Sequence, residues 1–311
     1  MKISKPNFWD YKKISFWSIL LFPFSIIYLI IFSTIRVLKT LKKYKKPSIP
    51  VICVGNIYLG GSGKTPLARE IFKITKNLGK NPAFIKKNYD YLSDEIKMLK
   101  DTGETFTNHD RKKGIFLSIT KNHDLAILDD GFQDFSIEPD FSILCFNSKQ
   151  MIGNGFIIPS GPLREKLSAV SRADCIIING NKNLEFEEKI LRNIKNKKVH
   201  IFYSKYKIKK IEKFNDKEID VFAGIGNPSN FFDLLRQNNL KIKKTYSFPD
   251  HHNYSQKDFE KMLKNKSEKL VTTEKDYYRM NKIQKQYCDY IEVDLEIENN
   301  DEFKKIIKTY L

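Results

Sequence analysis

A glycine-rich segment constrains the fold of this chain more than any other feature of its sequence. It reads VICVGNIYLGGSGKTPLARE, beginning at Val51. The apolar, β-branched run at 50–54 predicts a buried parallel strand, and the residues at 67–72 predict a helix. Glycines let the backbone approach an anion, and a helix N-terminus presents free N–H groups to it. The segment therefore predicts a phosphate-binding loop (P-loop) in a parallel α/β sheet.

The end of this loop carries side chains suited to a nucleoside triphosphate. Lys64 can reach the β- and γ-phosphates of ATP, and the Thr65 hydroxyl can ligate Mg²⁺. Tyr58 stands where the usual pattern G-x-x-x-x-G-K-[ST] has its first glycine. A plain glycine turn before a helix is the alternative, but the flanking strand and helix favour the nucleotide site. The expected nucleotide-binding residues are Gly60, Gly61, Ser62, Gly63, Lys64, Thr65 and Pro66.

A second candidate element is the strand LAIL, which ends in Asp129-Asp130-Gly131. In P-loop proteins, an aspartate at a strand end commonly lies beside the loop and holds Mg²⁺ or its water. An ordinary turn is the alternative for such a tripeptide. Because this one closes an apolar strand after the loop, we assign Asp129 and Asp130 to the metal side of the site, together with Thr65.

Two arginines lie close together in GNGFIIPSGPLREKLSAVSRAD, at Arg164 and Arg172. Most basic residues of the chain are lysines, so these two arginines suggest a specific role. Arginine grips a phosphate through two parallel hydrogen bonds, which lysine cannot do. A surface salt bridge is the alternative.

Composition excludes some classes of protein and leaves others open. Hydrophobic residues make up 41% of the chain, enough for a packed core. The net charge of +18 would suit nucleic acid or an anionic membrane, but no basic-aromatic nucleic-acid module is present, so no nucleic-acid partner is predicted. The four cysteines form no CxxC pair and are expected to be reduced core residues in the cytosol: Cys53, Cys145, Cys175 and Cys288.

The N-terminal region predicts a membrane anchor. No charged residue occurs from Ile14 to Ile35, a stretch long enough to span a bilayer. Trp9, Tyr11 and Trp17 resemble interfacial anchors. A basic collar follows at Arg36, Lys39, Lys42, Lys43, Lys45 and Lys46. A cleaved signal peptide is less favoured, because no A-x-A site follows and a nucleotide-binding loop belongs in the cytosol. The sequence leaves open whether the segment spans the bilayer or lies in one leaflet.

After the loop, apolar runs alternate with helical stretches, as in an α/β parallel sheet. The expected strands are Ala83–Ile85, Leu125–Leu128, Phe141–Phe146, Cys175–Ile178, His200–Tyr203, Ile219–Ala223, Leu270–Thr272 and Tyr290–Val293. The polar stretch at 100–113 is expected to form a loop, and 205–217 a connector. In FPDHHNYS, a metal site at Asp250-His251-His252 lacks further ligands at diagnostic spacing. We therefore interpret His251 as an acid/base group in a loop.

Taken in order, the strings VGNIYLGGSGKTP, DDGFQ, GNGFIIPSGPLRE, AGIGNP, FPDHH and TTEKD resemble the tetraacyldisaccharide 4′-kinase family of lipid A biosynthesis. The similarity runs from the apolar N-terminus to about Asp276. The irregular spelling of the loop at Tyr58 is typical of that family.

The resemblance implies an enzyme that uses ATP and Mg²⁺ on the cytoplasmic face of the bacterial inner membrane. Its substrate would be an acylated disaccharide lipid, phosphorylated at the 4′-hydroxyl to give lipid IVA; no protein partner is predicted. It also implies a P-loop NTPase-like parallel-sheet lobe, a second smaller α/β lobe, a site between them and an N-terminal membrane helix. The expected ranges are 1–38 for the anchor, 39–205 for the P-loop lobe and 206–311 for the C-terminal lobe.

Residue roles also follow from the resemblance. Lys64 and Asp130 would act in catalysis, and Gln133, Arg164 and Glu165 would bind the substrate. Asp94, in YLSDEIKML, would pair with His251 to activate the sugar hydroxyl, each residue coming from a different lobe.

The chain departs from the family pattern at three places. Lys87-Asn88-Tyr89 stands in place of Arg-Gly-Tyr, Ser93-Asp94-Glu95-Ile96 in place of Gly-Asp-Glu-Pro, and Asp134 in place of a histidine. These departures concern the lipid-facing end of the site, whereas the ATP-binding end keeps its pattern.

A membrane-tethered P-loop GTPase or ATPase switch is the alternative function. Such a GTPase would carry [NT]-K-x-D for guanine. The nearest string, Thr273-Glu274-Lys275-Asp276, has its lysine one place late.

Overall fold

The computed structural model describes residues 5–11, 13–42, 46–89, 93–194, 197–264, 267 and 269–311. Lys43 and Lys45 of the expected basic collar lie outside these residues. Contacts divide the chain into two compact units, each considered by itself. The described parts of Lys5–Asn88, Thr102–Lys205 and Glu296–Leu311 form the P-loop unit, and those of Tyr89–Asp101 and Tyr206–Leu295 form the C-terminal unit.

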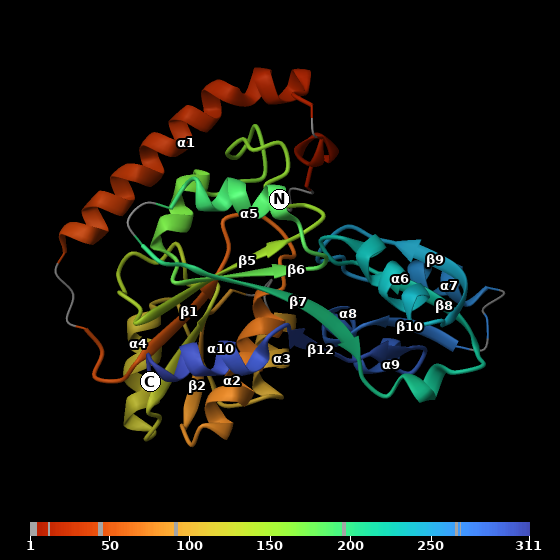
Figure 1. The fold of residues 1–311 in the computed structure, drawn as a ribbon. Helices are drawn as coiled ribbons and strands as arrows, with labels where there is room; N and C mark the ends of the chain where they lie inside the picture. Colours follow the sequence, from red (N-terminus) through yellow and green to blue (C-terminus); the bar gives the residue numbers. More distant parts are fainter. Residues whose placement is uncertain are drawn as a thin grey trace. The chain divides into compact units, whose positions relative to one another are not determined.

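The P-loop unit is built on a sheet with the strand order β12-β7-β6-β5-β1-β4-β2-β3 (Figure 1). The pairs from β3 through β7 are parallel. Its strands are β1 (Val51–Gly55), β2 (Pro82–Lys87), β3 (Thr105–Asn108), β4 (Leu125–Asp129), β5 (Phe141–Asn147), β6 (Cys175–Asn179), β7 (His200–Ile208) and β12 (Val293–Ile297). The central strands β1, β4 and β6 are buried at every position, as expected for a sheet covered on both faces.

Helices connect and cover these strands. They are the 3₁₀ helix η1 (Asn7–Asp10), α1 (Phe16–Leu41), α2 (Lys64–Asn77), α4 (Arg111–Thr120), the 3₁₀ helix η3 (Leu167–Arg172), α5 (Leu184–Leu191) and α10 (Asn300–Lys308). Helix α2 contacts β1, β2 and β4, and α4 contacts β2 and β3. Helix α10 packs through Phe303 against Phe202 of β7. The carboxyl ends of β1 and β4 are neighbours, and ligands of open α/β sheets bind at such ends.

The C-terminal unit has its own parallel sheet, in the order β11-β10-β8-β9. Its strands are β8 (Glu218–Ala223), β9 (Lys241–Ser247), β10 (Lys269–Thr273) and β11 (Asp289–Ile291). Its helices are α3 (Ser93–Lys100), the 3₁₀ helix η4 (Ile211–Phe214), α6 (Pro228–Gln237), α7 (Gln256–Leu263), α8 (Glu274–Arg279) and α9 (Lys282–Lys285). A buried aromatic cluster around Phe222, Tyr254 and Phe259 forms part of its core.

The division differs from the expected ranges in two places. Helix α3 was expected in the P-loop lobe, but it groups with the C-terminal unit, where Lys275 of α8 forms an ion pair with Glu95 at 3.0 Å. The last residues, which include α10, group with the P-loop unit instead of the C-terminal lobe, because Phe303 and Ile307 are buried there. Each displaced helix packs on an element that lies far away in the sequence, α3 on α8 and α10 on β7.

The expected strands are all present, with ends shifted by a few residues, and the last of them is two strands, β11 and β12. The polar stretch at 100–113 was wrongly expected to be only a loop, because it contains β3 and the start of α4. Strand β9 was missed, since its exposed and partly buried positions alternate along a lysine-rich edge strand, with no fully buried residue. The expectation that the cysteines are reduced and buried is confirmed at all four positions.

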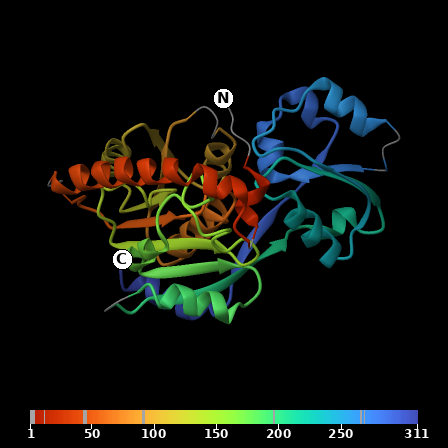
Figure 2. The ribbon, with the colours of Figure 1, turned by 90° about the horizontal axis from the view of Figure 1, so that it is seen from above.

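Helix α1 exposes many apolar side chains, whereas its two buried residues are serines. Ser18 and Ser25 are buried, whereas Ile19 and Ile30 are 64% and 60% exposed. The Ser25 hydroxyl donates to the carbonyl oxygen of Ile157 at 2.8 Å. Figures 1 and 2 show α1 (red) along the outside of the P-loop unit. Surface helices of soluble proteins have the opposite pattern, with the apolar side turned inward.

Candidate functional site

The P-loop has the backbone that its glycines predict. Gly63 has φ = 88° and caps the N-terminus of α2, and Gly60 has φ = 133°. Residues with a Cβ rarely adopt either conformation. The buried amide of Asn56 donates to the carbonyl oxygen of Tyr58 at 2.6 Å and to the Ser62 hydroxyl at 2.8 Å. The loop is therefore shaped by its own hydrogen bonds, with its amides at the start of a helix.

Tyr58 anchors the loop at the position where the usual pattern has a glycine. It is buried, and it forms an antiparallel bridge with Leu163. Its hydroxyl donates to an oxygen of Asp10 at 2.6 Å, and burial together with this bond raises the pKa of Tyr58. Next to it, the N–H of Arg164 donates to the carbonyl oxygen of Ile57 at 2.8 Å. Tyr58 and its neighbour Ile57 thus hold the P-loop against the segment that carries Arg164.

The predicted metal-side residues lie together at the ends of β4 and α2. The Thr65 hydroxyl donates to Oδ2 of Asp129 at 2.9 Å, and Asp129 is fully buried. Oδ1 of Asp129 has no hydrogen-bond partner among the described residues. A buried carboxylate oxygen without a partner is costly, which makes it a candidate ligand for Mg²⁺ or its water. The residues present therefore fit a magnesium ion beside the P-loop.

Asp130 lies within reach of two cations. Its Oδ1 is 3.7 Å from Nζ of Lys64 and 3.1 Å from Nη1 of Arg164. Its backbone has φ = 60°, a left-handed conformation that is uncommon outside glycine. The next residue, Gly131, is required by space, since a Cβ there would come within 2.9 Å of Cys53 Sγ. The turn therefore presents Asp130 to Lys64 of the P-loop and to Arg164.

The residues predicted to bind substrate form one hydrogen-bonded network. The Gln133 amide donates to Oε1 of Glu165 at 3.0 Å, and Arg164 donates to Oε1 of Gln133 at 3.2 Å. Glu165 is held by both nitrogens of Arg172, at 2.8 and 2.9 Å. Arg172 thus forms the salt bridge that was the alternative for the arginine pair. Arg164 also forms a salt bridge, with Asp130 at 3.1 Å, and its role in substrate binding stays a prediction.

Sequence reasoning missed two residues of this centre, Lys86 and Arg111. Nζ of Lys86 lies 2.6 Å from Oδ2 of Asp129. The guanidinium of Arg111 donates to the carbonyl oxygen of Asp130 at 2.6 Å and to Oδ2 of Asp134 at 3.0 Å. Arg111 could have been singled out by the argument used for Arg164, because it is an arginine in a lysine-rich chain. Nothing in the sequence singles out Lys86, because a lysine in an apolar strand does not show which carboxylate it pairs with.

Asp134, one of the departures from the family pattern, has partners that suit a carboxylate. Burial by itself would raise the pKa of Asp134, but the hydrogen bond from Ser136 and the charge of Arg111 lower it. Lys87, at another departure, has its Nζ 3.9 Å from Oδ2 of Asp134. The two departures therefore lie together, and their charges are opposite.

The predicted acid/base pair lies within the C-terminal unit. Nδ1 of His251 is 3.8 Å from Oδ2 of the fully buried Asp94, too far for a hydrogen bond. Asp94 is instead held by Nε of Arg279 at 2.7 Å. The expectation that the two residues come from different lobes differs from this arrangement, because α3 packs on α8 in one unit.

The charge state of His251 depends on neighbours of both signs. A neighbouring carboxylate by itself favours the charged imidazole. Burial and the positive charge of Lys275 instead lower the pKa of His251, with a smaller contribution from Arg279, against the opposing effects of Asp250 and Asp94. The imidazole is therefore neutral at neutral pH, the state in which it can accept a proton.

No group of three or more metal-ligating side chains occurs in the part of the chain that the structure describes. Asp250-His251-His252 is thus not such a group, and Nε2 of His252 lies 3.0 Å from Asp258. A metal ion at the P-loop would then depend on Thr65, Asp129, phosphate oxygens and water.

Comparison with known proteins places this geometry in context. The family model described as tetraacyldisaccharide-1-P 4′-kinase matches residues 17–96 and 86–311. A protein of Pelagibacter ubique named tetraacyldisaccharide 4′-kinase is 40% identical over 315 residues, covering 99% of this chain and 98% of its own length. A protein of the same name from Francisella tularensis subsp. novicida is 30% identical over 321 residues, covering 93% of this chain and 98% of its own length.

A solved structure shows the same fold. It is described as the "apo" form of LpxK from Aquifex aeolicus in complex with ATP, and it matches with a TM-score of 0.71. The match covers 94% of this chain and 99% of that one at 24% sequence identity. The expected fold class, a P-loop NTPase-like parallel-sheet lobe with a smaller α/β lobe, is thereby confirmed.

Proposed function

Because the chain belongs to the tetraacyldisaccharide-1-phosphate 4′-kinase family, we propose that it phosphorylates the 4′-hydroxyl of a tetraacylated glucosamine disaccharide 1-phosphate. The phosphoryl donor is ATP and the product is lipid IVA, an intermediate of lipid A biosynthesis. The observation that carries this proposal is the Thr65–Asp129 hydrogen bond behind a glycine loop, with one buried oxygen of Asp129 left for a cation. This is the arrangement that phosphoryl transfer in P-loop proteins requires.

The residues of the P-loop unit bind and neutralise the phosphates. The N-terminus of α2 and Lys64 hold the β- and γ-phosphates, and Arg164 adds a cation that can contact the transferred group. Thr65 and Asp129 would hold Mg²⁺, which would further neutralise the phosphate charge. The 4′-oxygen attacks the γ-phosphorus, the bond from the γ-phosphorus to the bridging oxygen of ADP breaks, and ADP leaves.

We assign the removal of the hydroxyl proton to His251. A sugar hydroxyl is a poor nucleophile and must lose its proton as the phosphoryl group arrives. The lowered pKa of His251, caused first by burial, keeps the imidazole neutral and able to accept that proton. Asp94 is fully buried at 3.8 Å from the ring and stabilises the charge that forms. Both residues belong to the C-terminal unit.

Helix α1 supports binding to the membrane that holds the lipid substrate. It is long and apolar enough to cross a bilayer. However, it contacts the P-loop unit along much of its length: the Tyr28 hydroxyl donates to the carbonyl oxygen of Arg164 at 3.2 Å, and Arg36 lies over the ring of Phe135. A helix held along one side cannot be surrounded by lipid. We therefore propose that α1 lies in the cytoplasmic leaflet of the bacterial inner membrane, with its exposed apolar side in the acyl chains.

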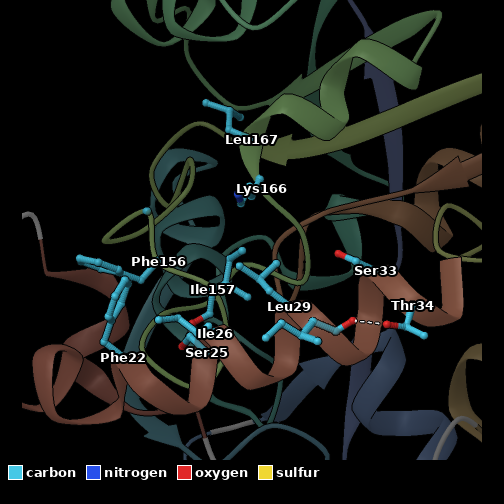
Figure 3. A pocket seen from close by; sticks show the side chains of 12 residues that line it. Phe22, Ser25, Ile26, Leu29, Ser33, Thr34, Phe156, Ile157, Lys166 and Leu167 are labelled. Carbon is cyan, nitrogen blue, oxygen red and sulfur yellow. Dashed lines mark hydrogen bonds between the residues drawn. The ribbon is translucent and has the colours of Figure 1, made fainter. Parts of the chain in front are cut away.

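A groove beside α1 offers a place for acyl chains. Its volume is about 740 Å³. Figure 3 shows α1 on one side of it, with Ile26 and Leu29; on the other side are the loop residues Phe156 and Ile157, and Leu167 at the start of η3. The groove is largely apolar, and it lies on the helix that we place in the membrane. A lipid could enter it without crossing water.

The surroundings of Asp276 argue against the GTPase alternative, in which this aspartate would bind the guanine base. Asp276 is fully buried, and it accepts hydrogen bonds from the backbone N–H of Gly224 at 3.0 Å and from the hydroxyls of Tyr254 and Thr273 at 2.9 and 2.6 Å. A carboxylate with these partners has a structural role in the C-terminal unit. The string TTEKD therefore does not read a base.

The direct test is phosphate transfer with purified full-length protein in detergent micelles. The protein is incubated with Mg²⁺, ATP labelled at the γ-phosphate and tetraacyldisaccharide 1-phosphate, and the lipid is separated by thin-layer chromatography. We expect label in the lipid at the 4′-position, and a much lower yield when GTP replaces ATP. Lipid-independent hydrolysis of GTP without lipid labelling would favour the switch over the kinase.

A further inference from the structure

A buried lysine lies beside the predicted metal-side carboxylate. Lys86 comes from β2 and Asp129 from the end of β4, two strands that pair in parallel with Ile85 opposite Leu128. The next residue on each strand therefore comes to the same level of the sheet. The side chains of Lys86 and Asp129 are 1% and 0% exposed, and their charged atoms lie 2.6 Å apart. Buried lysines are rare unless they are paired, so this pair calls for an explanation.

The two oxygens of Asp129 have different surroundings. Oδ2 accepts hydrogen bonds from both Lys86 and the Thr65 hydroxyl. Oδ1 is buried and accepts none from the described residues. The carboxylate is thus fixed through one oxygen, which leaves the other as the atom for a cation or its water.

The charge of Lys86 has two opposite effects at this position. Before a cation binds, it compensates a buried carboxylate that would otherwise be costly. Once a divalent cation arrives, the same ammonium group repels it across a short distance in a medium where charges interact strongly. We propose that Lys86 is a resident counter-cation of Asp129, which holds this carboxylate in place before the metal binds and weakens metal binding at Oδ1.

This proposal rests on the proposed function only in that Asp129 lies on the metal side of the P-loop. It makes Lys86 a positioning residue, which acts on the metal through the carboxylate. A device of this kind would keep the site intact without a bound metal and would favour release of the metal after each turnover.

The first test is the variant Lys86→Met, which keeps the length of the side chain and removes its charge. We expect its affinity for Mn²⁺, which prefers the same oxygen ligands as Mg²⁺, to be at least about tenfold tighter than that of the wild type. The titration uses Mn²⁺ alone at constant ionic strength, followed by electron paramagnetic resonance. We also expect a lower melting temperature without metal and a larger rise on adding Mg²⁺. A merely structural lysine would lower the melting temperature without tightening Mn²⁺ binding.

The neighbouring Lys87 provides a matched control, because its Nζ lies 3.9 Å from Asp134 and its side chain is 27% exposed. Lys87→Met should leave the Mn²⁺ affinity of the wild type unchanged. A second variant, Lys86→Met with Asp129→Asn, removes both buried charges and should regain the melting temperature lost in Lys86→Met while losing the response to metal. If Lys86→Met does not fold, the double variant should.

Three results would overturn the proposal. They are unchanged or weaker Mn²⁺ binding in Lys86→Met, a double variant no more stable than Lys86→Met, and an equal gain of Mn²⁺ affinity in Lys87→Met. These measurements need no lipid and no phosphate transfer. A failure of the proposed kinase activity would therefore leave their outcome unchanged, and the two failures can be told apart.

Discussion

Replacing Arg279 by methionine should weaken the C-terminal unit and change the titration of His251. Arg279 donates to Oδ2 of Asp94 at 2.7 Å, to Oδ1 of Asp276 at 2.9 Å and to the carbonyl oxygen of Gly224 at 2.7 Å. Both carboxylates are fully buried. Arg279→Met keeps much of the apolar stem and removes the one charge that the two acids share.

The size of the effect follows from what each acid keeps. Asp276 retains its bonds from Gly224, Tyr254 and Thr273, so it loses one partner among several. Asp94 loses its closest cation. Breaking a buried ion pair by removing one partner typically costs 3–5 kcal/mol, and we expect about 3 kcal/mol in the free energy of unfolding. Because the positive charge of Arg279 lowers the pKa of His251, that pKa should rise in Arg279→Met.

The stability assay is urea unfolding, read from the shift of the midpoint for the C-terminal unit. The control is Arg236→Met, which removes an arginine from an exposed pair with Asp233 at 3.3 Å and should cost less than about 1 kcal/mol. The variant Arg279→Met with Asp94→Asn neutralises the orphaned acid and should lose less than Arg279→Met alone. The pKa of His251 is measured by nuclear magnetic resonance titration. Equal losses in Arg279→Met and Arg236→Met, or a fall in the pKa of His251, would refute the reasoning.

Further predictions concern catalysis, the membrane and acid stability. Lys64→Ala should lower kcat by at least about 10²-fold with an unchanged melting temperature, because a main charge contact to the transition state is lost; wild-type turnover would contradict the assignment. Asp94→Ala and His251→Ala should lower kcat without changing ATP affinity, and the double variant should be little worse than the worse single variant; multiplying losses would argue against a shared function. Ile19→Gln with Ile30→Gln should release the protein from anionic vesicles in a flotation assay, since both side chains are exposed on α1; retention like the wild type would place the anchor elsewhere. The folded pKa of His251 lies below its unfolded value, so the unfolded chain binds more protons and stability should fall as the pH drops below about 6.5; His251→Asn should flatten this dependence in urea titrations at several pH values.

The sequence by itself determined the elements whose pattern is local. The apolar run before the glycines, the glycines with positive φ and the helix after Lys64 lie within one short segment. The strand follows from its apolar pattern, the loop from the backbone freedom of its glycines, and the helix from its own apolar spacing. Each of these depends on residues that are near in the sequence. The strand that ends at Asp129 was predictable for the same reason, whereas its pairing beside β1 joins residues far apart in the sequence and was decided by the tertiary structure.

The apolar N-terminal segment was also readable, but only the tertiary structure decided its placement. Composition predicted a membrane helix of sufficient length. The burial of Ser18 and Ser25 against the P-loop unit, with Ile19 and Ile30 exposed, favours a helix with one side on protein. A hydropathy pattern cannot specify this, because the partners of those serines are more than a hundred residues away.

Tertiary structure alone decided which charges meet. Lys86 and Asp129, Arg111 and Asp134, and Arg279 and Asp94 are separated by 43, 23 and 185 residues. No periodicity links such positions, because a salt bridge between elements depends on strand order and helix packing. The same holds for α3, which groups with the C-terminal unit because Asp94 and Glu95 find their cations on α8. Local chemistry therefore fixed the phosphate loop, and long-range packing chose the counter-charges that surround it.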